Sequence, residues 1–413
     1  MNPSNRFGKV GRPHKGRFVK NHSPALISIA CMLAVVPAAL VQRGGVTKRG
    51  TSTLPATPSP SLSIRVAGNR LVNGKGETIR LLGVNRSGTQ YACVGNWGIF
   101  DGPSDAASVK AMASWKINTV RVSLNEHCWL GINGVNPAYS GANYQNAIVN
   151  YVNLLHQHGL YVVLDLHWSA PGKTLAKSQQ MMADLDHSPA FWSSVATKFK
   201  NDPAVLFDLY NEPHNVNNNY ACWRDGCTIS TISTSSSSQV SGSWRSAGMQ
   251  SLVDAVRGTG ATQPIVLSGD GYGGNLYKWA DYKPKDPLNS LVASVHTYNF
   301  SSCVTVTCWN NMIKPVAAVV PVVSGEMGEN DCAHGFIDMY MNWMDSIGAG
   351  YLGWGWVTSL LRHADPLWNR SAQPPRVSSL TSRKIEDSGM LCSLNSARLA
   401  MVKYAPCRRK QAR

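Results

Sequence analysis

Charged residues are scarce in this chain of 413 residues, and they are unevenly placed. They make up 15% of the sequence against 43% hydrophobic residues, which excludes a disordered or collagen-like chain and allows a large buried core. Acidic residues are absent from residues 1–50, which hold nine Lys and Arg, and number three against eleven in residues 361–413. From totals of 39 basic and 23 acidic residues, 19 and 20 are left for residues 51–360. The formal charge of +16 therefore lies in the two ends, and we expect no nucleic-acid binding by the body.

Nucleotide and metal motifs are also missing. No G-x-G-x-x-G follows the first expected strand, which argues against a dinucleotide site. The close cysteine pairs are separated by four residues rather than two, and no His stands beside them at ligand spacing, which argues against zinc. We therefore expect no metal ion and no organic cofactor.

A long apolar run is found only near the N-terminus. Six Lys and Arg in residues 1–20 precede the uncharged stretch Pro24–Val41, a pattern typical of a secretory signal, with a cleavage site after Ala38. The stretch is also just long enough to span a bilayer, so residues 1–41 are interpreted as a signal peptide or a signal anchor. The Ser/Thr/Pro-rich residues 42–62 are interpreted as a linker. We expect a secreted protein that contacts the membrane only if the segment stays uncleaved.

The ten cysteines agree with export, because disulfides persist in oxidising compartments. Two close pairs lie in loop-like sequence, and two further cysteines each follow an expected strand. The sequence therefore predicts three disulfides: Cys222–Cys227, Cys303–Cys308 and Cys93–Cys128.

Short β-branched or aliphatic runs alternate with helical patterns along residues 63–357. The runs are nearly continuous in hydrophobicity, which indicates strands buried on both faces. The helical patterns include Asn143–His158, with one apolar stripe, and a helix start at Ser188-Pro189 with Ser188 as its cap. The expected strands are Ile79–Val84, Thr119–Ser123, Tyr161–Leu166, Val205–Tyr210, Pro264–Ser268, Leu291–Val295, Val319–Ser324 and Gly350–Trp356.

Eight strand–helix units predict an α/β protein with a (β/α)8 TIM barrel over residues 63–357. Residues 66–83 carry two turn signals and predict an N-terminal β-hairpin that closes the bottom of the barrel. A doubly wound open sheet is the alternative. The C-terminal end is atypical, because residues 358–413 are basic and only weakly periodic. A helix between Leu391 and Tyr404 and an altered reading frame are the two interpretations of this tail.

Polar or aromatic side chains follow almost every expected strand, where barrels of this type carry their catalytic groups. These positions hold Arg121, His167, Asn211, Glu212, His296, Tyr298, Glu326 and Trp354. Two carboxylates on separate strands, Glu212 and Glu326, are the groups that glycoside hydrolysis uses. Five tryptophans offer flat apolar faces to sugar rings, with packing in the core as the alternative for each: Trp97, Trp129, Trp168, Trp309 and Trp354.

The motifs around these positions resemble the family five glycoside hydrolases, which are clan A barrels. They are LDLHW around His167, FDLYNEPH around Glu212, SVHTYN around His296 and VVSGEMGEN around Glu326, together with NTVRVSLNEHCWLGING and YLGWGW. The resemblance covers residues 64–357 and leaves the substrate open, because the family includes cellulases, mannanases and other β-glycanases.

The resemblance implies that Glu212 is the general acid/base and Glu326 the nucleophile. Arg121 and Tyr298 would hold Glu326 ionised and aimed, whereas Glu329 is interpreted as a bystander. Burial and the nearby negative charge should raise the pKa of Glu212, so that it holds a proton. We expect retention of configuration, for which the carboxyl groups must lie about 5–5.5 Å apart rather than about 9 Å.

The remaining site residues are implied in the same way. Asn211 would bind the sugar 2-hydroxyl, and His167 and His296 would line the site. Trp354, rather than Trp356, would lie under the sugar at the cleaved bond.

A cysteine that the family places soon after the last tryptophan is absent here, which leaves Cys332 without its expected partner. Cys392 and Cys407 are the other candidates.

These observations favour a secreted, monomeric, retaining endo-β-1,4-glucanase whose partner is a polysaccharide, with β-glucan as the leading substrate. A β-mannanase or another β-glycanase of the same family is the nearest alternative. A non-catalytic carbohydrate-binding barrel, and a cationic protein that binds nucleic acid or membrane surfaces through its tails, are the alternatives from other classes.

Overall fold

The computed structural model describes most of the chain between residues 62 and 356. The expected signal segment 1–41, all but the last residue of the linker and the tail 358–413 lie outside the described residues. No helix in the described ranges is both long and apolar enough to cross a bilayer. The residues left out between the two ends are 215, 217–218, 232–239, 241 and 332, so the partner of Cys332 stays undetermined.

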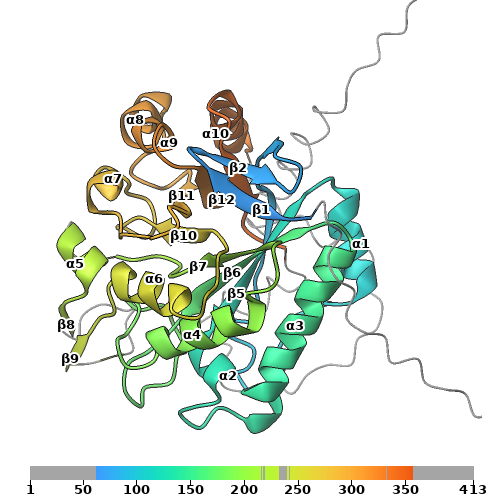
Figure 1. Ribbon diagram of the computed structural model, residues 1–413, viewed down its shortest axis with the longest axis vertical. Helices are drawn as coiled ribbons and strands as arrows, with labels where there is room; N and C mark the ends of the chain where they lie inside the picture. The colour runs from blue at the N-terminus through green and yellow to red at the C-terminus, as the bar shows by residue number, and fades with distance from the viewer. Residues whose placement is uncertain are drawn as a thin grey trace, which may run out of the picture. The chain divides into compact units, whose positions relative to one another are not determined.

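Eight parallel strands form a closed barrel in which each strand pairs with its neighbour in chain order (Figure 1). Tyr351 of the last strand pairs with Leu82 of the first, which closes the cylinder. The predicted (β/α)8 TIM barrel is therefore confirmed, and the open sheet is excluded. The strands are β4 (Leu82–Arg86), β5 (Thr119–Asn125), β6 (Tyr161–Trp168), β7 (Val205–Asp208), β10 (Ile265–Ser268), β11 (Leu291–Tyr298), β12 (Val322–Gly328) and β13 (Gly350–Gly353).

Helices alternate with these strands and lie around the barrel (Figure 1). They are α1 (Ala106–Ser114), α2 (Glu126–Leu130), α3 (Ala142–Gln157), α4 (Ser188–Phe199), α5 (Tyr220–Asp225), α6 (Met249–Arg257), α7 (Trp279–Tyr282), α8 (Val306–Met312), α9 (Lys314–Ala317) and α10 (Gly335–Ser346), with a 3-10 helix at Pro137–Tyr139. Between α5 and α6 the chain also forms an antiparallel pair, β8 (Thr228–Thr231) with β9 (Gly242–Arg245).

Helix α3 illustrates why these segments are helical. Its apolar residues recur at helical spacing, and the chain turns at Gly159, whose φ of +76° suits glycine. The predicted range Asn143–His158 differs from the observed one by one residue at each end. The buried stripe consists of Tyr144, Ile148, Tyr151, Val152 and Leu155.

Helix α4 begins at the predicted place, but its cap prediction was wrong. His187 is the N-cap, and Ser188 is already inside the helix. The reason is that the Ser188 hydroxyl donates to Glu126 Oε2 at 2.5 Å instead of capping the helix backbone. A side chain that finds a buried carboxylate is no longer available as a cap.

Two predicted strands also begin at the wrong residue. Ile79 belongs to a separate small sheet and not to the first barrel strand, and Val319 is 52% exposed in the segment that follows α9. In both places one apolar run continues across a change of element, which hydrophobicity by itself does not reveal.

The N-terminal hairpin is in fact a three-stranded antiparallel sheet of β1 (Ile64–Ala67), β2 (Arg70–Asn73) and β3 (Thr78–Ile79). The second turn signal brings in the third strand, which corrects the prediction. Leu62, Ile64 and Leu71 pack with inward-facing barrel residues such as Leu206 and Val292. The sheet therefore closes one end of the barrel by apolar burial, and Leu62 belongs to this barrel core although it was assigned to the linker.

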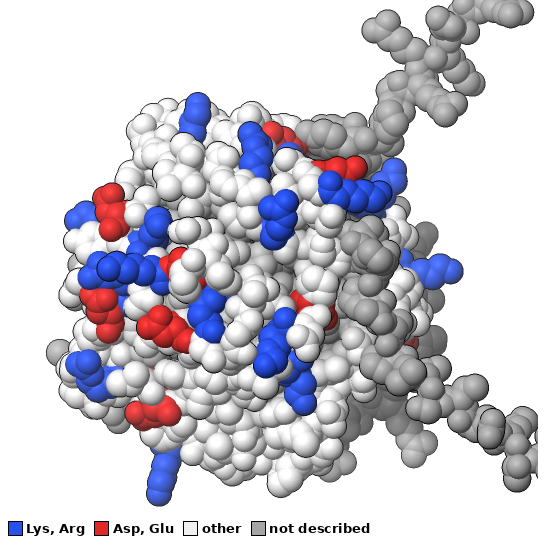
Figure 2. All heavy atoms as spheres, in the orientation of Figure 1, with Lys and Arg blue, Asp and Glu red and all other residues white. Residues whose placement is uncertain are grey.

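Charges on the body are mixed in sign. On the face shown in Figure 2, basic and acidic side chains are interspersed among wide neutral areas. This distribution agrees with the near-balance of 19 basic and 20 acidic residues counted for residues 51–360.

The three predicted disulfides are confirmed. Cys93 pairs with Cys128 across 35 residues of sequence, whereas Cys222–Cys227 and Cys303–Cys308 each span five. Cys93 and Cys128 are buried in the main core, so this bridge ties the loop after β4 to α2.

The three bridges should differ in their contribution to stability. Loop-closure entropy predicts that the Cys93→Ser, Cys128→Ser double variant loses about 4 kcal/mol of unfolding free energy, and the Cys303→Ser, Cys308→Ser variant about 2 kcal/mol. Urea unfolding of both variants against the unaltered chain measures this difference. Equal losses would show that loop length does not set the effect here.

Candidate active site

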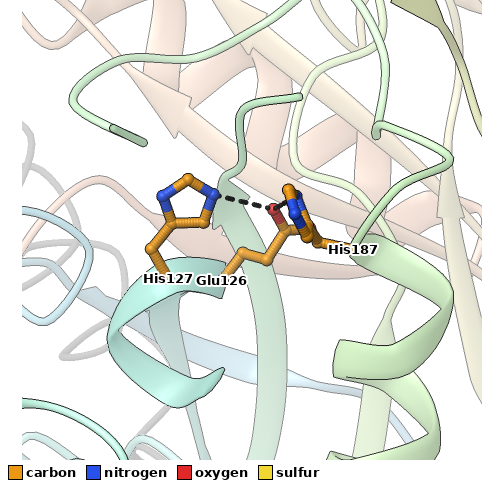
Figure 3. A group of neighbouring side chains, drawn as sticks. All are labelled: Glu126, His127 and His187. Carbon is orange, nitrogen blue, oxygen red and sulfur yellow. Dashed lines mark ion pairs between the residues drawn. The ribbon is translucent and has the colours of Figure 1, made fainter. Parts of the chain in front are cut away.

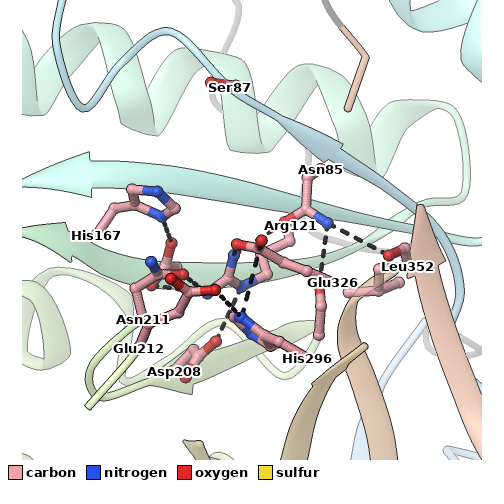
Figure 4. Close-up of polar contacts among 12 residues, drawn as sticks. Asn85, Ser87, Arg121, His167, Asp208, Asn211, Glu212, His296, Glu326 and Leu352 are labelled. Atoms are coloured by element: carbon pink, nitrogen blue, oxygen red, sulfur yellow. Dashed lines mark hydrogen bonds and ion pairs between the residues drawn. The ribbon is translucent and has the colours of Figure 1, made fainter. Parts of the chain in front are cut away.

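The eight predicted site residues converge at the carboxyl ends of the barrel strands. Figure 4 labels Arg121, His167, Asn211, Glu212, His296 and Glu326 among them. Arg121 lies within β5, and the other residues lie near or just past the ends of β6, β7, β11, β12 and β13. Because parallel strands all end at the same rim, residues up to 233 positions apart meet there. The full set is Arg121, His167, Asn211, Glu212, His296, Tyr298, Glu326 and Trp354.

Arg121 lies at the centre of this set and is completely buried. Its Nε donates to Asp208 Oδ2 at 2.9 Å, and its Nη2 lies 3.0 Å from Asp165 Oδ1. Its Nη1 donates to Glu326 Oε1 at 3.0 Å, and its Nη2 also donates to Asn211 Oδ1 at 2.8 Å. Its Nη1 also donates to Asn85 Oδ1 on β4 at 2.9 Å, so one guanidinium contacts side chains from four other strands.

Asp165 and Asp208 are site residues that sequence reasoning missed. Both are buried on barrel strands, and burial raises their pKa to about 7 and about 8 despite the opposing charge of Arg121. The feature that could have revealed them is one acidic residue inside each otherwise apolar strand, in YVVLDLHW and VLFD. A carboxylate is rarely buried without a partner charge, so each one pointed to a buried cation.

Glu326 is held at both oxygens. Arg121 occupies Oε1, and the Tyr298 hydroxyl donates to Oε2 at 2.7 Å. Burial raises the pKa of the Tyr298 phenol, which therefore stays protonated and remains a donor. Asn85 Nδ2 fixes the strand nearby by donating to the Gly325 carbonyl at 2.9 Å. The side chain of Glu326 keeps 5% of its surface exposed.

Glu212 lies in a different environment, because no Lys or Arg side chain in the described part of the chain forms an ion pair with it. Burial raises the pKa of Glu212, while hydrogen bonding from Gln179 opposes the shift. His296 Nδ1 lies 2.9 Å from Glu212 Oε1, and burial lowers the pKa of His296 to about 3, so the imidazole is neutral. With 17% of its side chain exposed, Glu212 is the more accessible of the two glutamates.

The two carboxylates are close together. One oxygen of Glu212, one oxygen of Glu326 and a ring nitrogen of His296 all lie within 4.8 Å of one another. This separation agrees with the spacing of about 5–5.5 Å in retaining glycosidases and not with the wider gap of inverting ones.

Of the five tryptophans predicted as possible platforms, Trp168 is half-buried at the end of β6, and the other four divide into two groups. Trp129 and Trp309 are fully buried in the core, so the interpretation of these two as sugar platforms was wrong. Trp97 is 47% exposed, and Trp354 stacks on the His167 ring with centroids 5.4 Å apart. Trp356 instead packs edge-on against Trp115 at 5.3 Å, as expected for a residue turned away from the site.

A second cluster, of buried Glu126 and His127 with half-buried His187, has donor atoms within 4.8 Å of one another and could hold a metal ion by spacing alone (Figure 3). The hydrogen bonds of His127 argue against a metal ion at this cluster. Its Nδ1 accepts from the Ala176 amide at 3.2 Å, and burial lowers its pKa to about 4, so the ring is neutral with its proton on Nε2. Nε2 faces the Ala170 carbonyl at 3.1 Å and has no lone pair for a metal. The cluster is a hydrogen-bond network that supports the loop after β6.

Comparison with known families agrees with this geometry. The family model for Cellulase (glycosyl hydrolase family 5) matches residues 72–359. The chain belongs to glycosyl hydrolase family 5. The matched range runs from β2 past the last barrel strand, so it includes every residue of the site.

Family 5 relatives differ in substrate. Mannan endo-1,4-beta-mannosidase of Streptomyces lividans is 24% identical over 310 residues, which covers 71% of this chain and 66% of the relative. Endoglucanase 3 of Humicola insolens is 26% identical over 262 residues, which covers 61% of this chain and 58% of the relative. The family 5 chain thus spans less than two thirds of the length of each of these relatives.

Solved structures show the same barrel. The β-glucanase SdGluc5_26A from Saccharophagus degradans, in complex with cellotetraose, aligns with a TM-score of 0.55 at 17% identity, over 86% of this chain and 98% of that one. The catalytic domain of Thermobifida fusca endoglucanase Cel5A aligns with a TM-score of 0.52 at 18% identity, over 83% and 98%. At these identities the likeness shows a common fold.

Removing the positive charge of Arg121 should lower the stability of the folded chain. Arg121→Met leaves the carboxyl groups of Asp165, Asp208 and Glu326 buried without their counter-ion. We expect a loss of about 3–5 kcal/mol of unfolding free energy at neutral pH. Because the folded-state pKa values of the two aspartates are raised, their protonation relieves the repulsion at low pH. The part of the loss that comes from these aspartates should therefore grow as the pH rises through about 7 to 8, where the unaltered chain ionises them beside Arg121.

Urea unfolding at several pH values measures this effect. The control is Arg224→Met, which removes a surface ion pair with Asp225 and should leave stability unchanged. A loss for Arg121→Met that does not depend on pH would contradict the charge assignment.

Proposed function

We propose that this family 5 glycoside hydrolase is an endo-acting β-1,4-glucanase that works with retention of configuration. The observation that carries the mechanism is the approach of the Glu212 and Glu326 carboxylates within 4.8 Å at the strand ends. A gap of this size holds one anomeric carbon between two carboxylates.

In the first step, Glu326 would attack the anomeric carbon while Glu212 protonates the leaving oxygen. A bond forms between a Glu326 oxygen and the anomeric carbon, the glycosidic bond breaks, and the proton of Glu212 moves to the departing sugar. The contrast between the two environments supports these roles. Glu326 accepts two hydrogen bonds, one of them from a cation, whereas burial raises the pKa of Glu212 and favours its protonated form.

In the second step, Glu212 would act as a base. Water attacks the anomeric carbon of the glycosyl-enzyme, Glu212 takes the water proton, and the bond to Glu326 breaks. Two inversions at one carbon restore the β configuration, and Glu212 is again protonated for the next cycle.

The other residues would position these groups and the sugar. Arg121 and Tyr298 hold Glu326 at both oxygens, and His296 contacts Glu212. Asn211 is fixed through its carbonyl by Arg121 and through one amide N–H by Gln179, and its other amide N–H would bind a sugar hydroxyl. His167 is fixed by Asp165 at 2.6 Å and carries Trp354 on its face, which would place that indole under the sugar at the cleaved bond.

β-1,4-Glucan is the proposed substrate because the endoglucanases of Humicola insolens and Thermobifida fusca are among the relatives. Mannan is the second candidate on account of the Streptomyces lividans relative. We also propose that the protein is exported, which the three disulfides support.

A polysaccharide panel tests the substrate. Reducing-sugar release by the purified full chain should be fastest on carboxymethylcellulose and slower on mannan and laminarin, with Glu212→Gln as the inactive control. Fastest release from mannan would show that the substrate is wrong and leave the mechanism standing. Saccharide binding with no release from any polymer would favour a non-catalytic barrel.

Azide rescue tests the two carboxylate roles. Glu326→Ala should abolish turnover, and azide should restore part of it on an activated aryl β-cellobioside and give an α-glycosyl azide, because azide enters from the vacated face. Glu212→Ala with azide should give the β-glycosyl azide, since azide then opens the glycosyl-enzyme. Product configuration is read by proton NMR, and the same anomer from both variants would overturn the assignment.

A further inference from the structure

Gln179 contacts the acid/base directly but belongs to none of the motifs that identified the site. It is a half-buried residue of the loop between β6 and α4. Its Nε2 donates to the Glu212 carbonyl at 2.9 Å and to Glu212 Oε2 at 3.1 Å. Its Oε1 accepts from Asn211 Nδ2 at 3.0 Å. One amide therefore touches both residues at the end of β7.

The orientation of this amide is fixed by its partners. Both Glu212 atoms are acceptors, and Asn211 Nδ2 is a donor. A reversed Gln179 amide would face two acceptors with its own oxygen and a donor with its own nitrogen. Only the observed orientation satisfies all three contacts, so a hydrogen-bond donor always faces Glu212 Oε2.

The loop is anchored on both sides of Gln179. Before it, the Ala176 amide donates to His127 Nδ1, and the Ala176 carbonyl accepts from Asn125 Nδ2 at 2.8 Å. After it, the Tyr210 hydroxyl accepts from the Gln180 amide and donates to the Gln180 carbonyl at 2.8 Å. The amide of Gln179 is thus held in place before any substrate arrives.

We propose that Gln179 is a positioning residue for the acid/base, holding Glu212 Oε2 in place and favouring the ionised carboxylate that the second step requires. This inference rests on the proposed double displacement. Its chemical basis is that a carboxylate gains more from an N–H donor than a protonated carboxyl group does.

The need for such a donor follows from the two tasks of Glu212. Burial raises the pKa of Glu212 and suits it to donate a proton in the first step. If burial acted alone, the same residue would hold its proton too tightly to act as a base in the second. Gln179 moderates this shift and keeps Glu212 able to change between its two states.

Gln179→Met tests the proposal, because methionine keeps the length of the side chain and removes the donor. Losing a hydrogen bond to a charged group should raise the pKa of Glu212 by about one unit. For phenyl β-cellobioside, whose cleavage needs the protonated acid, the basic limb of kcat/KM should move up by that amount. For 2,4-dinitrophenyl β-cellobioside, whose turnover is limited by the second step, the acidic limb of kcat should move up as well.

A direct titration needs no turnover. The full-length protein labelled with 13C at the glutamate side-chain carboxyls, with the Glu212 signal assigned from Glu212→Gln, reports the pKa of Glu212 in both forms. Ser178→Ala is the matched control, because Ser178 is the neighbour of Gln179 on the same loop and its hydroxyl accepts a hydrogen bond from Gln180.

Four results distinguish the proposal from its alternatives. A pKa of Glu212 that rises in Gln179→Met and not in Ser178→Ala supports the proposal. The same pKa in Gln179→Met as in the unaltered chain, or an equal rise in Ser178→Ala, overturns it whatever the activity. Absence of turnover on every glycoside by the unaltered chain contradicts the proposed function, and the titration then still decides whether Gln179 controls the ionisation of Glu212.

Discussion

The site depends on one buried positive charge. Arg121 contacts Asp165, Asp208 and Glu326, which come from three different strands, and of these four side chains Glu326 is the most exposed, at 5%. Burial by itself would lower the pKa of Arg121, but the three carboxylates raise it above its ordinary value. The guanidinium therefore stays charged. It neutralises the buried carboxylates, and its directed N–H groups hold the side chains at the strand ends in position.

This arrangement makes two chemically identical side chains unequal. Glu326 accepts one hydrogen bond at each oxygen, from a guanidinium and from a phenol, whereas Glu212 contacts a neutral imidazole and an amide. The difference comes entirely from neighbours supplied by other strands and by one loop. That loop is in turn supported by the hydrogen-bond network around His127, so a cluster with metal-like spacing contributes to the site through loop geometry.

Structural features that depend on neighbours in sequence could be predicted, whereas features that depend on contacts between distant residues could not. Strand positions and the paired carboxylates could be predicted, because apolar runs and the residues that end them are local in sequence. The caps and strand ends at Ser188, Ile79 and Val319 could not, since each depends on a buried partner or on a change of element within one apolar run. Trp129 and Trp309 show the same limit for aromatics, because an indole that faces sugar and one that fills the core look alike in sequence.

By itself, the sequence determined the barrel and the three disulfides, and it predicted eight residues that the strand ends bring together. The period of hydrophobicity and the residues that follow each strand can be read directly from the chain. Only the tertiary structure decided that Asp165 and Asp208 share the charge of Arg121, and that Gln179 reaches Glu212 from a loop without a motif. The physical reason is that charge balance and hydrogen bonding depend on distances in space, and barrel closure brings together atoms whose separation in sequence carries no signal.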